Sequence, residues 1–496
     1  MTPATFRSRR LPRFARRYAP LALLLLAGCA AIPHLGPKPE PLAADRIAAE
    51  RSLAASPAEA WPGEGWWEAY GDPQLDQLIA EGLRNSPDAV AAEARFRNAG
   101  ALAQQAGAAT LPRVDVTGQV QEQKQSLNMG YPEAFQAFLP RGWNDGGQVA
   151  ANLGFDLDVW GRNRAALAAA TSEVRAAAID ARQARLMLAV GIASAYIDLD
   201  LLHAVRDIRA RQLEAAAASR KLLAQRQANG LETRGSVSTS SAEAANARAA
   251  LSQAEETLAL RRNQLAALVG AGPDRGLAIA RPALRAAAAR GLPERVTTDL
   301  VGRRPDIAAA RERVEVAGSR IKVARADFYP AIRLSALVGF QSLGLETLFN
   351  KNSSFGQVGP AVSLPIFHGG ELQGRYRGAR ADYDAAVASY DGTVLGAYRE
   401  TADAVTSARM ATQRLADARA ALAGSQDAFE MAEARYKGGL STFLDVLQVG
   451  DRLLQARLAA GAGEAAVRNS DLALVRALGG GFAAPQAVNP KDTPHG

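Results

Sequence analysis

The stretch that decides the fold is RNSPDAVAAEARFRNAGALAQQAGAATLPRVDV, residues 84–116, because the chain repeats it in its second half. The counterpart is GRRPDIAAARERVEVAGSRIKVARADFYPAIRL, residues 302–334, with Pro87 aligned to Pro305 at an offset of 218. The closing pieces LLAQRQANGLETRGSV and MAEARYKGGLSTFLDV, which end at Val237 and Val446, also match, at an offset of 209. A repeat of about 210 residues is far longer than a solenoid unit. The sequence therefore predicts one duplicated, pseudo-symmetric body.

The net charge excludes a large basic surface on the body of the protein. The 496 residues carry a formal charge of +8, but six arginines lie within the first 17 residues and the first 28 contain no acid. Removing those six leaves +2 for the rest. Nucleic acid is therefore not an expected partner.

Residues 1–28 have the pattern of a secretory signal peptide. An arginine-rich start precedes the apolar run LALLLLAG, which is too short to span a bilayer. The run ends in Leu26-Ala27-Gly28-Cys29, and Cys29 is the only cysteine of the chain. This tetrapeptide resembles a bacterial lipobox, in which the cysteine becomes a lipid-modified mature N-terminus; the alternative is a chance cysteine near an ordinary cleavage site. No disulfide and no transmembrane helix are expected after Cys29.

Four segments alternate between apolar and polar residues over about ten positions: 113–121, 148–159, 332–341 and 357–366. This period predicts β-strands with one apolar and one polar face. A soluble sandwich and a transmembrane barrel both use such strands. The barrel is favoured because the four strands form two hairpins separated by some 200 helical residues. Pro360 and Pro365 place the fourth strand near an edge or make its ladder irregular.

Four strands cannot close a barrel, and an open edge in lipid would leave backbone groups without partners. The barrel must therefore be shared between chains, with eight strands from two copies or twelve from three. Eight strands are filled by their own side chains, whereas twelve leave a lumen. The residues alone do not choose between these two assemblies.

Two long helical hairpins follow the strands. Residues 162–229 contain no proline and are rich in alanine, and 378–437 repeat the pattern. Apolar seams on two sides of the first helix indicate neighbours on both sides, as in a cylinder wall; a plain coiled-coil rod is the alternative. Each helix turns back at a Gly-Leu pair, Gly230-Leu231 or Gly439-Leu440, into return helices at 236–269 and 441–478.

The chain resembles a known family, the TolC-like outer-membrane efflux proteins, and in particular the NodT-type lipoproteins of resistance-nodulation-division pumps. The motifs that carry the resemblance are WWEAYGDPQLDQLI from Trp66, LGFDLDVWGRNR from Leu153, RRPDIAAARERVEVAGSRIKVARADFYPAIRLSA from Arg303, RYKGGLSTFLDVLQ from Arg435 and ALGGGF from Ala477. The resemblance implies a trimer with a twelve-stranded transmembrane β-barrel, a continuous α-helical coiled-coil tunnel of twelve helices and a mixed α/β equatorial belt.

The resemblance also implies a location, partners and a gate. The protein is expected in the cell outer membrane, extending into the periplasm, with a periplasmic adaptor protein and an inner-membrane pump as partners. In the family the periplasmic helix tips close the tunnel, and by motif Asp445 falls on a ring aspartate and Tyr436 on a gate tyrosine. This sequence departs from the family pattern at Gln448, where a second ring acid is expected, and at Ser441, where some members have an arginine. The latch is therefore expected to depend more on packing of Leu440, Phe443 and Leu444, and on hydrogen bonds, than on salt bridges.

No pattern of catalytic or metal-binding residues was found in the sequence. The four histidines are scattered, no G-x-S-x-G occurs, and GAGPDRG from Gly270 follows a helix and is interpreted as a turn. The expected function is a passive trimeric conduit for small molecules such as drugs, toxic compounds or metals, without a cofactor. The alternatives are an outer-membrane conduit for a type I protein secretion system and a structural coiled-coil lipoprotein.

The expected division of the chain follows from these segments. It consists of a signal peptide (1–28), an N-terminal segment (29–112), a first β-hairpin (113–160), a first helical hairpin (161–270), an equatorial linker (271–292), a helix of the second repeat (293–330), a second β-hairpin (331–367), a second helical hairpin with the gate tip (368–478) and a C-terminal tail (479–496).

Overall fold

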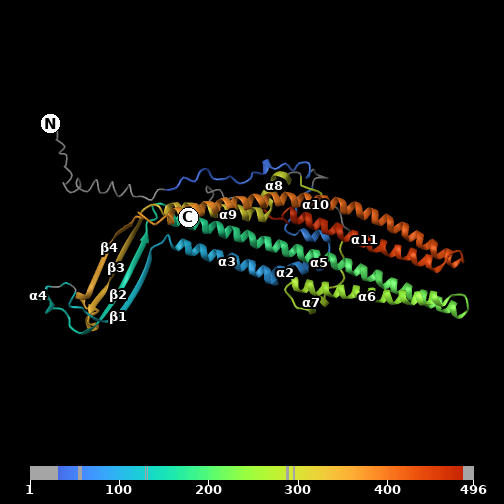
Figure 1. Ribbon diagram of the computed structural model, residues 1–496, viewed down its shortest axis with the longest axis horizontal. Coiled ribbons are helices and arrows are strands. Elements are labelled where there is room, and N and C mark those ends of the chain that lie inside the picture. The colour runs from blue at the N-terminus through green and yellow to red at the C-terminus, as the bar shows by residue number, and fades with distance from the viewer. Residues whose placement is uncertain are drawn as a thin grey trace, which may run out of the picture. The chain divides into compact units, whose positions relative to one another are not determined.

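The computed structural model describes residues 32–53, 59–128, 130, 132–285, 290–293 and 296–483 (Figure 1). The signal peptide, Cys29 and the end of the C-terminal tail lie outside these residues. The predictions made for them therefore stay predictions.

The duplication appears as two series of elements in the same order, in which the long helices have equal lengths. Each half has a 22-residue helix, two strands, a 67-residue helix and a 35-residue helix. In the first half these are α3 (Pro87–Ala108), β1 (Arg113–Lys124), β2 (Trp143–Asp156), α5 (Arg162–Ala228) and α6 (Arg234–Leu268). In the second half they are α9 (Pro305–Ala326), β3 (Ala331–Leu343), β4 (Ser354–Ser363), α10 (Glu371–Lys437) and α11 (Phe443–Ala477).

Short elements connect these long ones. They are the helices α2 (Pro73–Asn85), α4 (Glu133–Gln136), α7 (Pro273–Leu277) and α8 (Val296–Arg303), and 3₁₀ helices at Ala44–Arg46, Trp66–Tyr70, Leu345–Thr347 and Lys351–Ser353. The helix expected over 293–330 is divided before Pro305, because proline disfavours a helical residue before it and starts a new helix well. In the described part of the chain the strands are confined to β1–β4, and the described parts of the belt segments are helices and irregular backbone.

The four strands form one antiparallel sheet in the order β1-β2-β3-β4. β2 begins five residues earlier than its alternation predicted and ends three earlier, at Asp156. β4 is shifted three residues toward the N-terminus, so Pro360 lies inside it and Pro365 lies beyond its end. β4 is an edge strand, as the two prolines indicated, because a strand proline is tolerated at an edge.

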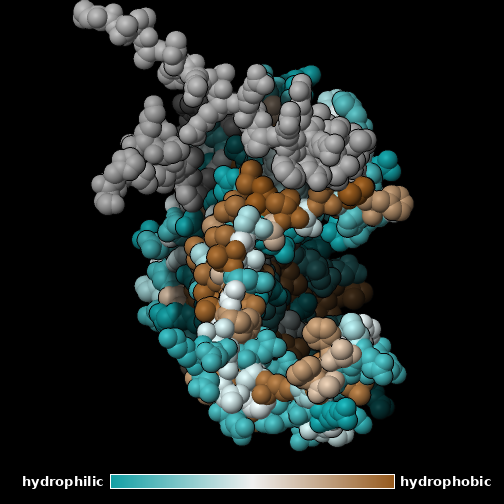
Figure 2. Space-filling view, turned by 90° about the vertical axis from the view of Figure 1, so that its left-hand side faces the viewer, coloured by the Kyte–Doolittle hydropathy of each residue, from teal (hydrophilic) through white to brown (hydrophobic). Residues whose placement is uncertain are grey.

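The pairing register gives the sheet one apolar and one polar face. In several rows the residues paired across the strands share their character. The apolar face has the rows Val114–Leu153–Ala336–Val358, Val116–Ala151–Val338–Gly356 and Phe155–Leu334–Pro360. The opposite face has Gln119–Gln148–Gln341 and Asp156–Arg333. In Figure 2, which views the molecule from the strand side, hydrophobic residues gather in patches bordered by hydrophilic ones.

The chain divides into two compact units that are each discontinuous in sequence. The first has residues 1–40, 98–174 and 312–387 and includes the sheet; the second has 41–97, 175–311 and 388–496 and includes the hairpin tips. The core of the second unit gathers α2, α5, α6 and α11 around fully buried side chains, among them Leu78, Ile192, Tyr196 and Leu265.

Among the described helices, α5 alone is long and apolar enough to cross a membrane by length and composition. Half of the residues in its most apolar 18-residue stretch are buried within the protein. Ile192, Tyr196 and Leu199 of α5 belong to the core of the second unit and are fully buried. This burial is typical of a core helix.

Arg304 ties the start of α9 to two other helices in the second unit. Its side chain is buried and donates to both carboxylate oxygens of Asp306, at 3.0 and 2.6 Å. It also donates to Glu400 of α10 at 2.9 Å and to the carbonyl of Ala477, the last residue of α11, at 3.1 Å. One guanidinium group therefore connects the start of α9, the end of α11 and the middle of α10, with a geometry that suits its planar fork of donors.

Candidate gate at the helix tips

The two helical hairpins end in tips of the same construction. After α5 the chain turns at Gly230, and after α10 at Gly439, both with positive φ. Leu231 N–H donates to the carbonyl of Arg226 at 2.9 Å, and Leu440 N–H to that of Arg435 at 2.8 Å. These are the bonds of a glycine C-cap, which requires the left-handed conformation that glycine adopts without strain.

Threonine caps begin both return helices, but the acid lies inside the return helix only at the second tip; at the first tip Glu232, before the cap, accepts from the Thr233 backbone N–H at 3.1 Å. The Thr233 hydroxyl accepts a bond from Ser236 N–H at 3.1 Å. In the second tip the Thr442 backbone N–H and hydroxyl donate to Asp445 at 2.9 and 2.8 Å, while Asp445 N–H donates back to the hydroxyl at 3.4 Å. This is a complete capping box, so Asp445 fixes the local turn in addition to any role in a pore.

The cap also controls the charge of Asp445. Hydrogen bonds from the Thr442 backbone and then its hydroxyl hold the pKa of the Asp445 carboxyl below its ordinary value of 3.8. A depressed carboxyl pKa means that the contribution of the ionised group is present at neutral pH and is lost only as the pH falls through the lowered pKa. The fully exposed carboxylate is therefore charged at physiological pH.

Tyr436 joins the two hairpins. Its ring lies 5.7 Å from the ring of Phe443 and 5.6 Å from the guanidinium carbon of Arg226, a residue in the last turn of α5. Its hydroxyl is buried and has no hydrogen-bond partner among the residues that the structure describes. A cation over an aromatic face is attractive, and a buried hydroxyl without a partner is unfavourable. The tyrosine is thus held by ring contacts alone.

The remaining predicted tip residues lie toward solvent in the single chain. Leu440 is 74% exposed and Leu444 59% exposed, whereas Phe443 is half-buried against Tyr436. Gln448 is exposed one turn after Asp445 in α11. The structure therefore brings Tyr436 and Phe443 together and leaves the two leucines without contacts that would bury them.

Sequence analysis overlooked two features of the tips. Arg226 was not assigned a role, although it stands one turn before a glycine cap and its repeat counterpart at the 209 offset is Arg435. The capping box was visible as Thr442-Phe443-Leu444-Asp445, which fits the pattern of a threonine followed three residues later by an acid.

Comparison with known proteins identifies the class of this architecture. The family model described as "Outer membrane efflux protein" matches residues 78–271 and 297–480, one segment in each repeat. The chain belongs to the outer membrane efflux protein family. Members of this family are transport channels, and this one is the outer-membrane channel component of a tripartite efflux pump.

Individual outer membrane efflux proteins match over most of the chain. The fusaric acid resistance protein FusA of Burkholderia cepacia is 37% identical over 72% of this chain and 68% of its own. The multidrug resistance outer membrane protein MdtP of Escherichia coli is 29% identical over 94% of this chain and 96% of its own. The crystal structure of the outer membrane protein VceC of Vibrio cholerae is 41% identical, with a TM-score of 0.78 over 85% of this chain and all of that one.

Proposed function

We propose that three copies of the chain assemble into one passive conduit. In this assembly the sheets close into a twelve-stranded barrel in the outer membrane, and the hairpins form a periplasmic tunnel that opens at the tips. A periplasmic adaptor protein and an inner-membrane pump of the resistance-nodulation-division class are the proposed partners. The pump supplies the energy and most of the selectivity, and this protein supplies the path.

The observation that carries the proposal is a two-faced sheet with two free edges. β1 is exposed along its whole length, and β4 is exposed at eight of its ten residues. Neither outer strand has a second partner among the described residues. Since the four strands alternate in direction, β4 of one copy and β1 of the next are antiparallel, as closed membrane barrels require. Copies can therefore join edge to edge without reversing any strand.

The polar face supports three copies over two. The rows of Gln119–Gln148–Gln341 and Asp156–Arg333 need water or partners once the sheet is closed. Eight strands would pack these side chains against each other in a filled interior, whereas twelve would line an aqueous lumen. The apolar rows on the opposite face then meet lipid.

The tips are the proposed gate. In a trimer, three copies of Asp445 would surround a narrow axis, where their carboxylates attract cations and repel each other. The exposed Leu440 and Leu444 would find apolar partners in neighbouring copies. Arg226 and Tyr436 hold the two hairpins of one copy together, so opening the tip would separate these two side chains.

Replacing Asp445 should make the channel less cation-selective. We expect Asp445→Ala to lower the cation-to-anion permeability ratio by about twofold or more, because three fixed charges leave the narrowest part of the pore. Asp445→Asn should do the same while keeping an oxygen for the cap. Reversal potentials in planar bilayers measure the ratio, and Glu232→Ala at the first tip is the matched control. Unchanged selectivity in both Asp445 variants would remove this residue from the pore.

Small molecules are the proposed cargo. This rests on the family resemblance of residues 303–336 and on the relatives, which are named for resistance to fusaric acid and to multiple drugs. A conduit for secreted protein is the second candidate within the channel class. A deletion strain tested against drugs, metals and solvents decides between them: hypersensitivity to small compounds supports efflux, and a secretion defect without hypersensitivity contradicts it.

A lipid on Cys29 is proposed as a second membrane attachment. Arg380, ten residues into α10, donates to the carbonyls of Gly36 and Pro37, and Lys38 lies 5.2 Å from the ring of Tyr383. Seven residues separate Gly36 from Cys29, and a chain of that length reaches at most about 25 Å. Arg380 itself is about 14 Å of helix from the start of α10, which follows β4. Cys29 can therefore reach the membrane end of the protein.

Removing Cys29 should remove the lipid. We expect Cys29→Ala to abolish incorporation of radiolabelled palmitate and to weaken membrane attachment of chains that have not assembled, because such chains then have neither a lipid anchor nor a closed barrel. The measurement is labelling followed by fractionation. Equal labelling of the variant and the wild-type protein would contradict the lipobox interpretation.

A further inference from the structure

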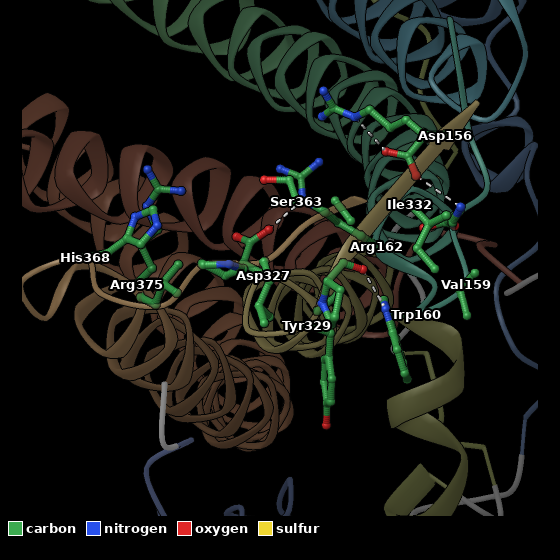
Figure 3. Close-up of a pocket in the computed structure, with 18 of the residues that line it drawn as sticks. Asp156, Val159, Trp160, Arg162, Asp327, Tyr329, Ile332, Ser363, His368 and Arg375 are labelled. Atoms are coloured by element: carbon green, nitrogen blue, oxygen red, sulfur yellow. Dashed lines mark hydrogen bonds and ion pairs between the residues drawn. The ribbon is translucent and has the colours of Figure 1, made fainter. Parts of the chain in front are cut away.

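A groove of about 560 Å³ lies between the first turns of α5 and the last turns of α9 in the first unit. The rings of Trp160 and Tyr329 form its rim, stacked at 4.7 Å and 18°. Trp160 Nε1 donates to the carbonyl of Pro330 at 2.8 Å, which fixes the indole (Figure 3). The groove is thus lined by two helices and by a stacked aromatic pair.

The charged residues that line the groove are all cationic: Arg164, Lys322 and Arg325. Arg164 is held in place by Asp158, which accepts from its side chain at 3.3 Å and from its backbone N–H at 2.9 Å. Lys322 and Arg325 are exposed, three residues apart on α9, and have no acidic partner among the described residues. No acid lines the groove itself, so it offers two uncompensated positive charges to a ligand.

The cationic groove adjoins a second groove, which reaches the polar face of the sheet, but the two use different faces of the helices. A second groove, of about 420 Å³, contains Asp156 and Arg333 from the polar face of the sheet, together with Asp327 and Arg375 (Figure 3). None of Arg164, Lys322 and Arg325 lines that second groove. Trp160, Ala326 and Tyr329 line both grooves, but Arg162 and Asp327 belong to the second groove alone. In the proposed barrel the cationic groove therefore lies on the helix faces away from Arg162 and Asp327, on the side of the apolar rows.

The level of the groove along the protein matches the boundary between the hydrocarbon and the headgroups of the membrane. The apolar face ends with the rows of Phe155–Leu334–Pro360 and Ile332–Val362, and Tyr329 lies two residues before β3. Trp and Tyr are enriched where hydrocarbon meets the headgroups. Arg325 lies about 6 Å beyond Tyr329 along α9, within the thickness of a headgroup layer, and Lys322, about 10 Å beyond Tyr329, lies at the periplasmic side of that layer. A headgroup layer is roughly 5–8 Å thick on each side of the hydrocarbon.

The groove also stays accessible when the barrel closes. It lies below β2 and β3, the two central strands of the sheet. Neighbouring copies would join at β1 and β4 instead. An edge-to-edge neighbour therefore leaves the groove open to lipid.

We propose that this groove binds the phosphate of an anionic phospholipid in the membrane leaflet that faces the periplasm. Lys322 and Arg325 contact the headgroup, and the Trp160–Tyr329 stack lies at the start of the acyl chains. The proposal rests on the proposed function, since it requires the sheet to face lipid. It adds a specific lipid site to the general membrane contact of a barrel.

Native mass spectrometry of the detergent-solubilised full-length protein tests the proposal. Titration with phosphatidylglycerol should give saturable binding that phosphatidylcholine and inorganic phosphate do not compete away. The double variant Lys322→Gln, Arg325→Gln should weaken it about tenfold, because each juxtamembrane cation contributes to anionic lipid binding. The matched control, Arg320→Gln with Arg377→Gln, removes two exposed helix charges of the same unit outside the groove and should bind as the wild-type protein does.

The possible results distinguish a failure of the proposed lipid site from a failure of the proposed trimer. Equal phosphatidylglycerol binding by the Lys322, Arg325 variant and the wild-type protein would overturn the proposal, as would full competition by inorganic phosphate. The same spectra report the number of chains in the complex. A wrong chain number with intact, groove-dependent lipid binding would contradict the trimer and leave the lipid site standing.

Discussion

Arg304→Gln is expected to destabilise the protein by about 3–5 kcal/mol, as is usual when one partner of a buried ion pair is removed. The side chain is 8% exposed and donates to Asp306, Glu400 and the last carbonyl of α11. Glutamine cannot reach all three, so a carbonyl at the end of α11 and two carboxylates lose their donor. Arg304→Lys should recover little, because an ammonium group does not reproduce the bidentate contact with Asp306.

The effect of Arg304→Gln can be measured on the stability of the whole protein and on hydrogen exchange at individual helix ends. Denaturation followed by circular dichroism should show an earlier midpoint, and hydrogen exchange should accelerate at the start of α9 and the end of α11. Arg320→Gln, an exposed arginine in the same helix, is the control and should change little. Wild-type stability in Arg304→Gln would mean that Asp306 and Glu400 find other partners, and would contradict the assigned role.

Arg304 and Gly479 give a structural role to two of the motifs that pointed to the family. Gly479 follows α11 with a φ of +88°, and a Cβ placed there would overlap the carbonyl oxygen of Arg303. The RRPD and ALGGGF motifs therefore meet in space, one supplying the guanidinium and the other a close backbone approach. The sequence shows both motifs. Neither motif by itself predicts that the two are in contact, because about 170 residues separate them.

The long elements could be predicted because their patterns are local. Alternation indicated the four strands, and the absence of proline indicated the long helices. Strand ends were less accurate, most clearly at β4, where Val358 to Ile366 alternates beyond the last paired residue, Ser363. Alternation reports which side chains face lipid or water, whereas a strand ends where its backbone pairing ends. Pro365, which has no N–H to donate, lies outside the ladder.

At the helix tips, too, features of short sequence segments could be predicted, whereas a contact between residues far apart in the sequence could not. The glycine turns and the candidate residues Tyr436 and Asp445 were evident in the sequence. The contact between Arg226 and Tyr436 was not, because it joins α5 to α10 across 210 residues and depends on how the two hairpins pack. The capping role of Asp445 is local and could have been predicted.

Cysteines on the two edge strands should link copies of the chain into closed rings of three. Asp115 of β1 and Gln357 of β4 lie on the polar face in the same row of the sheet. If β4 of one copy pairs with β1 of the next, a cysteine at Gln357 meets one at Asp115, Thr117 or Gln119, depending on the register between copies. Disulfides form only when the Cβ atoms approach to about 3.5–4.5 Å. One of the three pairs should therefore crosslink efficiently and the others poorly.

The control pair is Val116→Cys with Gln357→Cys, which uses the same two edges but opposite faces of the sheet. It should not crosslink, because successive side chains of a strand point to opposite faces. Cys29 is the only native cysteine, so Cys29→Ala provides a background without other thiols.

The most direct test of the central claim, that one chain supplies a third of a closed channel wall, is the size of the largest species formed by the efficient pair in native membranes. After oxidation, non-reducing gels should show one, two and three linked chains, with all species collapsing to one on reduction. A series that stops at two chains would indicate an eight-stranded barrel, and a link only within single chains would indicate that the sheet closes on itself. Either result would contradict the trimeric conduit.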